Sequence, residues 1–378
     1  MKYLAAICFA LIPFGFWGQN IFFGQANTLL LSAMFILFLC EQDNNYKLNG
    51  WIKIFGVYLS CWMSFTFLMI FLGRWPQALS MTMIESVFFV FAGMTFFLAV
   101  YRGSLSLNAW SNIICIVATI QAILGILQTQ GLDPIVPFLS LFVGVIGQMD
   151  FTTPTGTLGN QNFLAAFLAI SLPFFFRIKW HNIIIIPIEY DTVCPWKDHE
   201  IKLPYGWFLA LPIIIYALIL TRTTTAIGAA IVGSVYYFFG RKWALASVIP
   251  AFILYAVKYK GFILSNARTE YWLDAWKSTS HSWQTLIFGW GPGITWHPGN
   301  MLHSEYVNTF FSFGLIGIAL MMGYIFHVYK MNKMLFTVFI ILCIDMLGNH
   351  ALHITPTAVL IIIIIALIER EKKDLKCQ

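Results

Sequence analysis

Charged residues are scarce in this sequence, and no long polar stretch stands apart from the rest. Only 10% of its 378 residues are Asp, Glu, Lys or Arg, whereas 59% are apolar. Charged residues make up about a quarter of an ordinary water-soluble domain, so this composition excludes that class. We therefore expect an integral membrane protein, with residues 1–378 forming a single membrane domain.

Three further absences narrow the fold. The alternation of apolar and polar residues typical of a membrane β-barrel is missing, and only a helical bundle then satisfies the backbone in lipid. No repeat of fixed period occurs, and no matched pair of Gly- or Pro-broken helices indicates the inverted halves of a transporter. The seven cysteines lack metal-ligand spacing, so we expect neither disulfides nor structural zinc.

The sequence does contain a series of apolar runs, each near the roughly 20 residues that a helix needs to cross a membrane. They predict an all-α, polytopic bundle of about twelve transmembrane helices. The expected spans are residues 2–17, 24–40, 52–72, 81–101, 109–127, 160–177, 206–220, 225–240, 243–257, 305–329, 334–349 and 355–368.

The distribution of basic residues predicts the orientation. The formal net charge of +6 could suggest nucleic acid, but most Lys and Arg lie in short loops between apolar runs, which is a topology signal. With both termini cytoplasmic, that side receives sixteen of the 22 Lys and Arg, and no nucleic-acid partner is expected. The opposite, outer face receives only Arg74, Arg222, Lys258, Lys260, Arg268 and Lys277.

Two segments on the outer face, 128–159 and 258–304, are expected to form the face that carries an active site. The larger one, 258–304, lies between the ninth and tenth expected helices. Within it, NARTEYWLDAWKS predicts a short helix along the membrane surface, with Arg268 near its start. The other segment ends in FTTPTGTLGNQNFLA, whose hydroxyl and amide groups could bind a sugar or serve as ordinary turn residues.

Two arginines are candidates for binding phosphate. Arg222 lies in LTRTTTA, a short connection between apolar helices, where a guanidinium and the following helix N-terminus would both suit phosphate oxygens. Arg268 supplies a second cation on the same face, and two arginines would match a pyrophosphate. Alternatives stay open: Arg222 could reach to the membrane surface from a helix end, and Arg268 could pair with Glu270 or Asp274.

His303 stands where the segment 258–304 meets the tenth expected span. An imidazole that titrates near pH 6.5 can accept a proton from a hydroxyl at neutral pH, so His303 could act as a general base at the outer surface. It could also be a boundary histidine bonded to a loop carbonyl, and position alone does not distinguish it from the other outer histidines, His281, His297, His350 and His353.

Close pairs of carboxylates are absent from the outer face. A divalent metal beside a phosphate group usually binds such oxygens. Metal-independent chemistry is therefore expected, with arginines in place of the ion. Glu85 and Asp345 fall inside expected spans, and their carboxylates should face the interior of the bundle.

Several of these residues together resemble a known family. His303-Ser304, nine residues, and then Gly314-Leu315-Ile316-Gly317 match every specified position in the signature of the O-antigen ligase family. ARTEYWLDAW, LIFGWGPG and HSEY are similar to the outer loop of the wider ligase and polymerase superfamily. TGTLGNQNFLA resembles its Gly-Asn-x-Asn turn, with Gln161 where proline is frequent, and LTRTTTA resembles its arginine-containing segment. The resemblance covers residues 150–320 in sequence and the remainder in topology.

The resemblance implies a multi-pass protein of the bacterial inner membrane, with the outer face in the periplasm. Proteins of that family transfer a glycan from undecaprenyl pyrophosphate to an acceptor hydroxyl, commonly a lipid A core sugar, in lipopolysaccharide biosynthesis. By analogy, His303 is the base, and Arg222 and Arg268 bind the departing pyrophosphate, with inversion and without metal or cofactor. The matched motifs add the expected substrate-binding residues Asn160, Asn162, Glu305 and Tyr306.

Other functions of this architecture stay open. O-antigen polymerases and O-linking protein oligosaccharyltransferases share the outer loop, although the absence of Lys and Arg from 128–159 favours a ligase over a polymerase. A transporter or flippase for a lipid-linked glycan would explain the spans and the embedded carboxylates without any catalytic residue. The single large outer loop and the complete His-to-Gly pattern favour an enzyme.

Overall fold

The computed structural model describes residues 6–7, 9–10, 93, 96–102, 105–133, 154–158, 160–176, 206–258, 267–290, 304–328, 333–348 and 355–377. At some helix ends, including 206–209, 251–258, 267–269 and 372–377, it describes the backbone alone. His303, Glu85, most of the first four expected spans and most of the segment 128–159 lie outside the described residues. The part that is described contains helices and no strand, so the all-α expectation is confirmed there.

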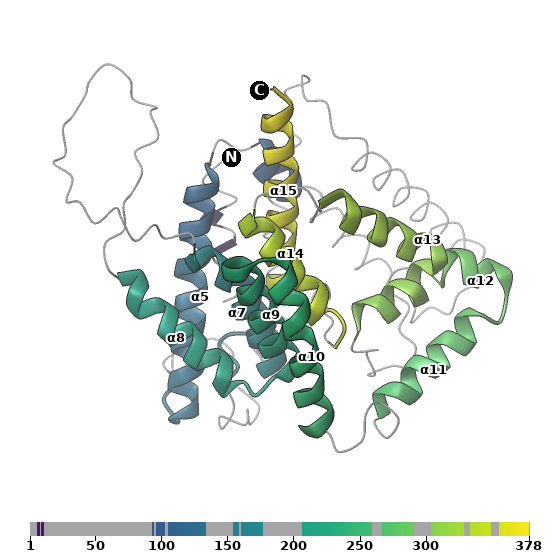
Figure 1. Ribbon diagram of the computed structural model, residues 1–378, viewed down its shortest axis with the longest axis horizontal. Helices are drawn as coiled ribbons and strands as arrows, with labels where there is room; N and C mark the ends of the chain where they lie inside the picture. Colours follow the sequence, from purple (N-terminus) through teal and green to yellow (C-terminus); the bar gives the residue numbers. More distant parts are fainter. Residues whose placement is uncertain are drawn as a thin grey trace, which may run out of the picture.

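Eight of the expected spans coincide with helices whose ends lie within a few residues of the predicted ends, except that the last runs on beyond residue 368. A ninth helix confirms the short helix expected in the large outer segment, and a tenth, α12, was not expected. In chain order (Figure 1) they are α5 Leu107–Thr129, α7 Gln161–Phe176, α8 Gly206–Leu220, α9 Thr224–Phe239, α10 Arg241–Lys258, α11 Ala267–Thr279, α12 Trp283–Phe288, α13 Glu305–Val328, α14 Lys333–Asp345 and α15 Thr355–Cys377.

The helix α7 forms the centre of the bundle, because it is apolar all round. Every residue from Phe163 to Phe175 is buried, and the helix packs against α5, α8, α9, α14 and α15. A helix with no polar face must be enclosed by other helices or by lipid. These five helices therefore surround α7, and α10 packs against the outside of α9. We call α5, α7, α8, α9, α10, α14 and α15 the central bundle.

The helices of the central bundle alternate in direction. The hydroxyl of Tyr237 donates to the carbonyl of Phe176 at 3.2 Å, which joins the last turns of α9 and α7. Lys333 begins α14, and its Nζ lies 5.6 Å from the centre of the Tyr237 ring. At the opposite end, an added Cβ on Gly348 would lie 2.5 Å from Cγ2 of Thr225, so the turn after α14 touches the first turn of α9. We call these two ends the Lys333 end and the Arg222 end.

Basic residues are concentrated at the Lys333 end. Arg241 and Lys242 begin α10 directly after α9 ends, and Arg370 of α15 donates from Nη1 to the carbonyl of Leu105, just before α5, at 2.6 Å. Arg222 and the backbone of Lys258, the last residue of α10, lie at the other end. The orientation of the two ends in a membrane stays a prediction.

The helices α11, α12 and the first half of α13 lie beside the central bundle, on the right in Figure 1, and we call them the arm. Trp276 of α11 stacks on Phe310 of α13, with ring centres 4.8 Å apart and planes at 18°. Gly314 interrupts α13 with non-helical angles (φ 62°, ψ −156°). The second half of α13 then returns to the bundle, where His327 Nε2 lies 3.1 Å from Oε1 of Glu369 on α15.

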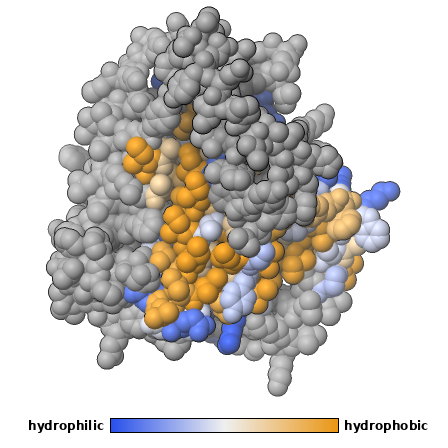
Figure 2. Space-filling view, turned by 90° about the vertical axis from the view of Figure 1, so that its left-hand side faces the viewer, coloured by the Kyte–Doolittle hydropathy of each residue, from blue (hydrophilic) through white to orange (hydrophobic). Residues whose placement is uncertain are grey.

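Apolar side chains also cover part of the outside of the molecule. Figure 2 shows a broad hydrophobic stripe on the side where α5 and α8 lie, and exposed residues there include Ile116, Ile120 and Ile123 of α5 with Ile215 and Ile219 of α8. Among the described residues, α5 and α13 are long and apolar enough to cross a membrane, and α7, α8 and α9 are apolar but shorter. That they span a membrane stays a prediction.

Candidate functional site

Arg222 occupies a turn that an arginine adopts only at a cost. It lies between α8 and α9 with φ 54°, and no other non-glycine residue in the described part of the chain has a positive φ. This left-handed conformation costs an L-residue roughly 1–2 kcal/mol. The side chain is exposed, and within the described residues its guanidinium makes no ion pair or hydrogen bond. The turn therefore presents an available cation in a strained backbone, a combination that is typical of functional sites.

The threonines beside Arg222 hold the turn. Thr221 is fully buried and donates its hydroxyl to the carbonyl of Leu218 at 2.6 Å. Thr223 is 7% exposed, and its hydroxyl donates to Oδ1 of Asn162 at 2.9 Å. The side chain of Thr223 makes no capping bond to α9. Its hydroxyl proton is used within the fold, where the bond to Asn162 fixes the turn.

The turn before α7 is fixed in the same way. Oδ1 of Asn160 accepts from the backbone N–H of Asn162 at 2.8 Å, a local bond by which an asparagine favours the start of a helix. The amide of Asn162 then reaches Thr223 on α9. The two asparagines expected to bind substrate therefore also join the start of α7 to the turn of Arg222, and their contact with substrate stays a prediction.

Two glutamines of α5 support this turn, and sequence reasoning missed them. Oε1 of Gln128 accepts from both the backbone N–H and the hydroxyl of Thr155, at 3.0 and 3.2 Å. Oε1 of Gln121 accepts from the same two groups of Thr157, at 2.9 and 3.0 Å. The detectable signal was a pair of amide side chains seven residues apart, which a helix presents on one face.

The start of α13 rests on the end of α14. The backbone N–H of Glu305 donates to the carbonyl of Met346 at 3.0 Å, and the hydroxyl of Ser304 reaches the same carbonyl at 3.4 Å. The hydroxyl of Tyr306 donates to the carbonyl of Cys343 at 2.9 Å. Tyr306 was expected to bind substrate, and its hydroxyl already has this partner within the fold. Together these bonds place residues 304–306, the start of α13, at the Arg222 end.

Two buried carboxylates lie at this junction. Glu305 is 2% exposed and Asp345 is fully buried, and they directly precede Tyr306 and Met346, which take part in the bonds between α13 and α14. The expectation that Asp345 faces the interior is confirmed. Within the described residues, no group of three or more His, Cys, Asp or Glu side chains is arranged to hold a metal ion.

The first motif glycine, Gly314, has a structural explanation. Its φ is 62°, and an added Cβ would fall on the carbonyl group of Ile287 and lie 2.7 Å from the backbone nitrogen of Gly289. Gly289 has φ 73° and would clash with the backbone of Ser312 in return. A hydrogen bond from Trp290 N–H to the carbonyl of Phe311, at 2.8 Å, closes the contact. Only glycine allows two backbones to approach this closely, so these two positions attach α12 to α13.

The helix α11 packs along the first half of α13. Ala275 and Phe311 are buried against each other, with Tyr271 and Val307 packed around them. Trp276 of α11 also stacks on Phe310 of α13, and Figure 1 shows α11 and the first half of α13 running in the same direction. The first turn of α11, which contains the backbone of Arg268, therefore lies toward the beginning of α13. The side chain of Arg268 lies outside the described residues.

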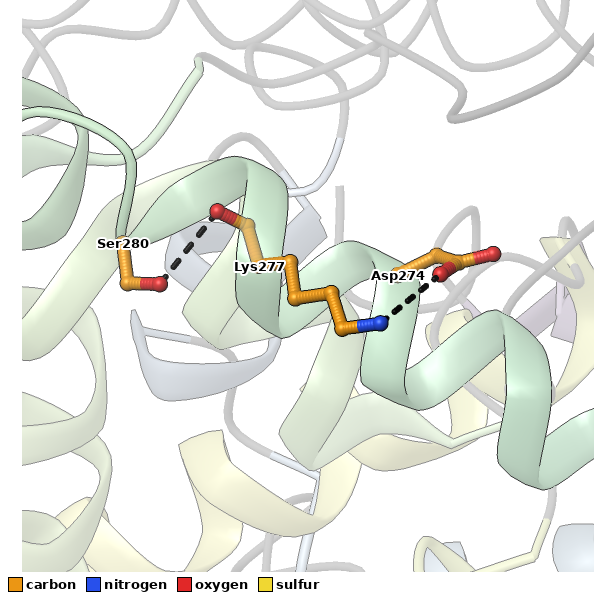
Figure 3. A network of polar contacts seen from close by, with 3 residues as sticks. All are labelled: Asp274, Lys277 and Ser280. Atoms are coloured by element: carbon orange, nitrogen blue, oxygen red, sulfur yellow. Dashed lines mark hydrogen bonds and ion pairs between the residues drawn. The ribbon is translucent and has the colours of Figure 1, made fainter.

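The opposite face of α11 is polar and exposed. Lys277 Nζ lies 4.0 Å from Oδ1 of Asp274, and these side chains are 76% and 51% exposed. Figure 3 shows this pair with Ser280, whose hydroxyl donates to the carbonyl of Lys277 at 3.3 Å. Exposed pairs of this kind contribute little stability. The helix is held by its Ala275 face, and its charges remain in contact with solvent.

The structure thus joins five of the expected site residues through one continuous set of contacts. Asn162 bonds to the turn of Arg222, Thr225 touches the turn after α14, and that turn binds the start of α13. The five are Asn160, Asn162, Arg222, Glu305 and Tyr306. No family model matches the sequence, and no curated protein matches it, so the likeness to the O-antigen ligase family rests on the motifs themselves.

Proposed function

We propose that this protein is an O-antigen ligase-like glycosyltransferase of the bacterial inner membrane. It transfers a glycan from undecaprenyl pyrophosphate to an acceptor hydroxyl, such as a lipid A core sugar, on the periplasmic side. In this proposal the chain forms a bundle of about twelve transmembrane helices, both termini are cytoplasmic, and the Arg222 end faces the periplasm. The Lys333 end, with its basic residues, then faces the cytoplasm.

Hydroxyl groups inside the helices support a location in lipid. Five of them donate at 2.7 Å to the carbonyl four residues earlier, and so need no water: Ser111, Thr119, Ser171, Ser234 and Thr337. Pro173, Pro212 and Pro250 lie inside helices, which membrane helices tolerate better than soluble ones. The exposed isoleucines of α5 and α8 would then contact lipid chains.

The turn of Arg222 is the observation that carries the proposal. The guanidinium of Arg222 is exposed and has no partner among the described residues, and the left-handed turn that holds it is surrounded by buried hydrogen bonds. Such a group suits an anion that arrives from outside the fold. A guanidinium binds phosphate oxygens in a fork. A pyrophosphate attached to a membrane lipid would meet it at the edge of the bundle, beside the Gly-Asn-x-Asn turn and the start of α13.

The proposed reaction is a single displacement. His303 takes the proton of the acceptor hydroxyl, and the oxygen attacks the anomeric carbon of the glycan. The bond from that carbon to the pyrophosphate oxygen breaks, and the electron pair leaves with undecaprenyl pyrophosphate. Arg222 and Arg268 stabilise the negative charge that grows on the leaving oxygen, and cations held in advance favour the transition state over the ground state. The anomeric configuration is inverted.

Reconstitution tests the proposal. The purified protein is placed in liposomes with a lipid-linked glycan as donor and without added metal. Three acceptors are then compared: lipid A core, a further molecule of the lipid-linked glycan, and a protein. The proposal predicts a covalent product with lipid A core. Product with another acceptor would assign the chain to the polymerase or protein-glycosylating members of the superfamily. Movement of the glycan across the bilayer without product would contradict the enzyme and favour a transporter.

Substitutions locate the chemistry. His303→Ala, Arg222→Ala and Arg268→Ala should each abolish transfer at unchanged protein level, and Arg222→Lys should be poor because an ammonium cannot reproduce the fork. Lys277→Ala is the matched control, since Lys277 is an exposed cation on the same helix as Arg268 but already has Asp274 as its partner. Near-normal transfer by His303→Ala would remove His303 from the role of base.

A further inference from the structure

Gln121, Gly125 and Gln128 form one face of α5. The spacings are four residues and then three, and residues at these spacings are neighbours on one face of a helix. Both glutamines are buried, at 0% and 3% exposure. An added Cβ on Gly125 would lie 2.8 Å from Cδ2 of Leu164 and 3.4 Å from Cβ of Pro154, so this face touches the segment 154–158 and the first turn of α7.

The two glutamines bind that segment in a repeated pattern. Each Oε1 accepts from the N–H and the hydroxyl of a single threonine, Thr155 or Thr157. Nε2 of Gln128 also donates to the carbonyl of Gly156 at 2.8 Å. Nε2 of Gln121 is buried and, among the described residues, has no hydrogen-bond partner. A buried donor without a partner costs free energy that an apolar side chain would avoid. The benefit of glutamine at position 121 therefore comes from its oxygen, which accepts the two bonds from Thr157.

Gly156 fits this arrangement closely. Its φ is 56°, and an added Cβ would lie 2.7 Å from Oε1 of Gln121. The segment therefore bends in a conformation that glycine adopts readily, with its backbone N–H groups directed to the two glutamines. Hydrogen bonds to the two glutamines thus fix the segment 154–158 on α5, in addition to the apolar packing of Pro154 and Leu158.

The segment leads directly to the turn of Arg222. It precedes Asn160, whose side chain bonds to the backbone of Asn162, and Asn162 accepts from Thr223. Because Thr223 follows Arg222, its position limits the conformation of the strained residue. A continuous series of hydrogen bonds and short backbone connections therefore runs from the interior of α5 to the backbone of Arg222.

We propose that Gln121 and Gln128 are positioning residues for Arg222. They act through residues 154–158 and 160–162 and through the Asn162–Thr223 bond, and they touch neither the glycan nor the pyrophosphate. This inference rests on the proposed function for its catalytic consequence. Its structural content, that α5 determines the geometry of the Arg222 turn, can be measured independently of transfer.

Hydrogen exchange tests the structural content. Peptides covering 154–162 and 219–227 are followed by mass spectrometry in the full-length protein and in Gln128→Met, which has a similar shape but no amide. We expect exchange at least threefold faster in both peptides, because the N–H of Thr155 loses its acceptor and the turn before α9, which the Asn162–Thr223 bond holds, loses its support. In Thr223→Val, which breaks the bond to Asn162, adding Gln128→Met should accelerate only the first peptide.

Ser111→Ala is the control. Ser111 is also a buried polar residue of α5, but its hydroxyl bonds within the helix near the other end, so both peptides should exchange as in the wild type. If Gln128→Met unfolds the protein, Thr157→Val serves instead, because it removes only the hydroxyl that donates to Oε1 of Gln121. Unchanged exchange of 219–227 in a folded variant would overturn the inference whatever happens to transfer.

Kinetics test the catalytic consequence. In reconstituted protein, Gln128→Met should raise KM for the lipid-linked donor about fivefold, corresponding to about 1 kcal/mol, and leave KM for the acceptor unchanged. Equal effects on both substrates would indicate general destabilisation and would contradict the positioning role. If the wild type transfers no glycan while the exchange coupling is present, the proposed function fails and the structural link stands.

Discussion

The central bundle and the arm are held together by different means. The bundle has a large apolar core around α7, in which many Leu, Ile, Phe and Ala side chains are buried. Among the described residues, the hydrophobic cluster of the arm contains two buried residues, Ala275 and Phe311. Within the arm, α12 is held on α13 by two backbones that meet at Gly289 and Gly314. Apolar packing tolerates exchange between residues of similar volume, whereas a contact between backbones does not tolerate a side chain.

This difference suggests why sequence motifs concentrate in the arm and at its junctions. The bundle needs apolar residues in helices, and many sequences supply them. The arm must present the backbone of Arg268 and the start of α13 in one arrangement with little buried surface to stabilise it. Particular residues therefore carry that arrangement, and changes there should affect function before they affect the fold of the bundle.

Gly314→Ala should have the largest effect. The new Cβ would strike the carbonyl of Ile287 in a left-handed backbone, which together costs about 2–5 kcal/mol. This cost exceeds the stabilisation that the small hydrophobic cluster of the arm provides. The helix α12 should therefore detach from α13, and glycan transfer should fall by at least a hundredfold. Helix content measured by circular dichroism should stay close to that of the wild type, because the bundle does not depend on this contact.

Gly228→Ala is the matched control for that change. Gly228 lies in α9 with nothing within 4 Å of an added Cβ, and alanine favours a helix interior by roughly 0.5–1 kcal/mol over glycine. Transfer should be unchanged, and the melting temperature should rise slightly. Normal transfer by Gly314→Ala would show that the arm does not need its close contact.

Tyr306→Phe should have a moderate effect at the junction of arm and bundle. It removes the bond from the Tyr306 hydroxyl to the carbonyl of Cys343 and keeps the ring, so stability should fall by about 1 kcal/mol, measured by thermal unfolding in detergent. Transfer should fall only a few-fold if the hydroxyl is structural. A complete loss of transfer at a nearly normal melting temperature would instead assign Tyr306 to substrate binding.

Lys277→Ala should have the smallest effect. The ion pair with Asp274 is exposed, and such pairs contribute about 0–1 kcal/mol, so neither the melting temperature nor transfer should change measurably. Raising the salt concentration should have equally little effect on the stability of the arm. A strong loss of transfer would show that the outer face of α11 binds a substrate or a membrane surface.

The ends of most helices could be predicted from sequence because apolar runs there stop at polar or turn-forming residues. The spans expected at 206–220 and 225–240 agree with α8 and α9 to within a residue. The helix α15 continues to Cys377, well past the expected end at residue 368, because Glu, Arg and Lys are good helix formers and the apolar pattern does not register them. In these regions local composition decides the structure.

The close contacts of the site could not be predicted, because they depend on residues far apart in the chain. The sequence identified Gly314 as part of a motif, but only the approach of Ile287 explains why glycine stands there. The sequence also singled out Arg222 by its charge, without its left-handed backbone. Gln121 and Gln128 were missed because their partners, Thr157 and Thr155, lie 36 and 27 residues away in the chain.

The central claim is that the turn keeps an arginine, despite its strain, in order to bind a departing pyrophosphate. Arg222→Gly tests it most directly, because glycine adopts φ 54° without the roughly 1–2 kcal/mol that arginine costs there. The melting temperature and the rate of glycan transfer would be measured on the same reconstituted sample. We predict a protein at least as stable as the wild type that transfers no glycan, whereas near-normal transfer would contradict the account.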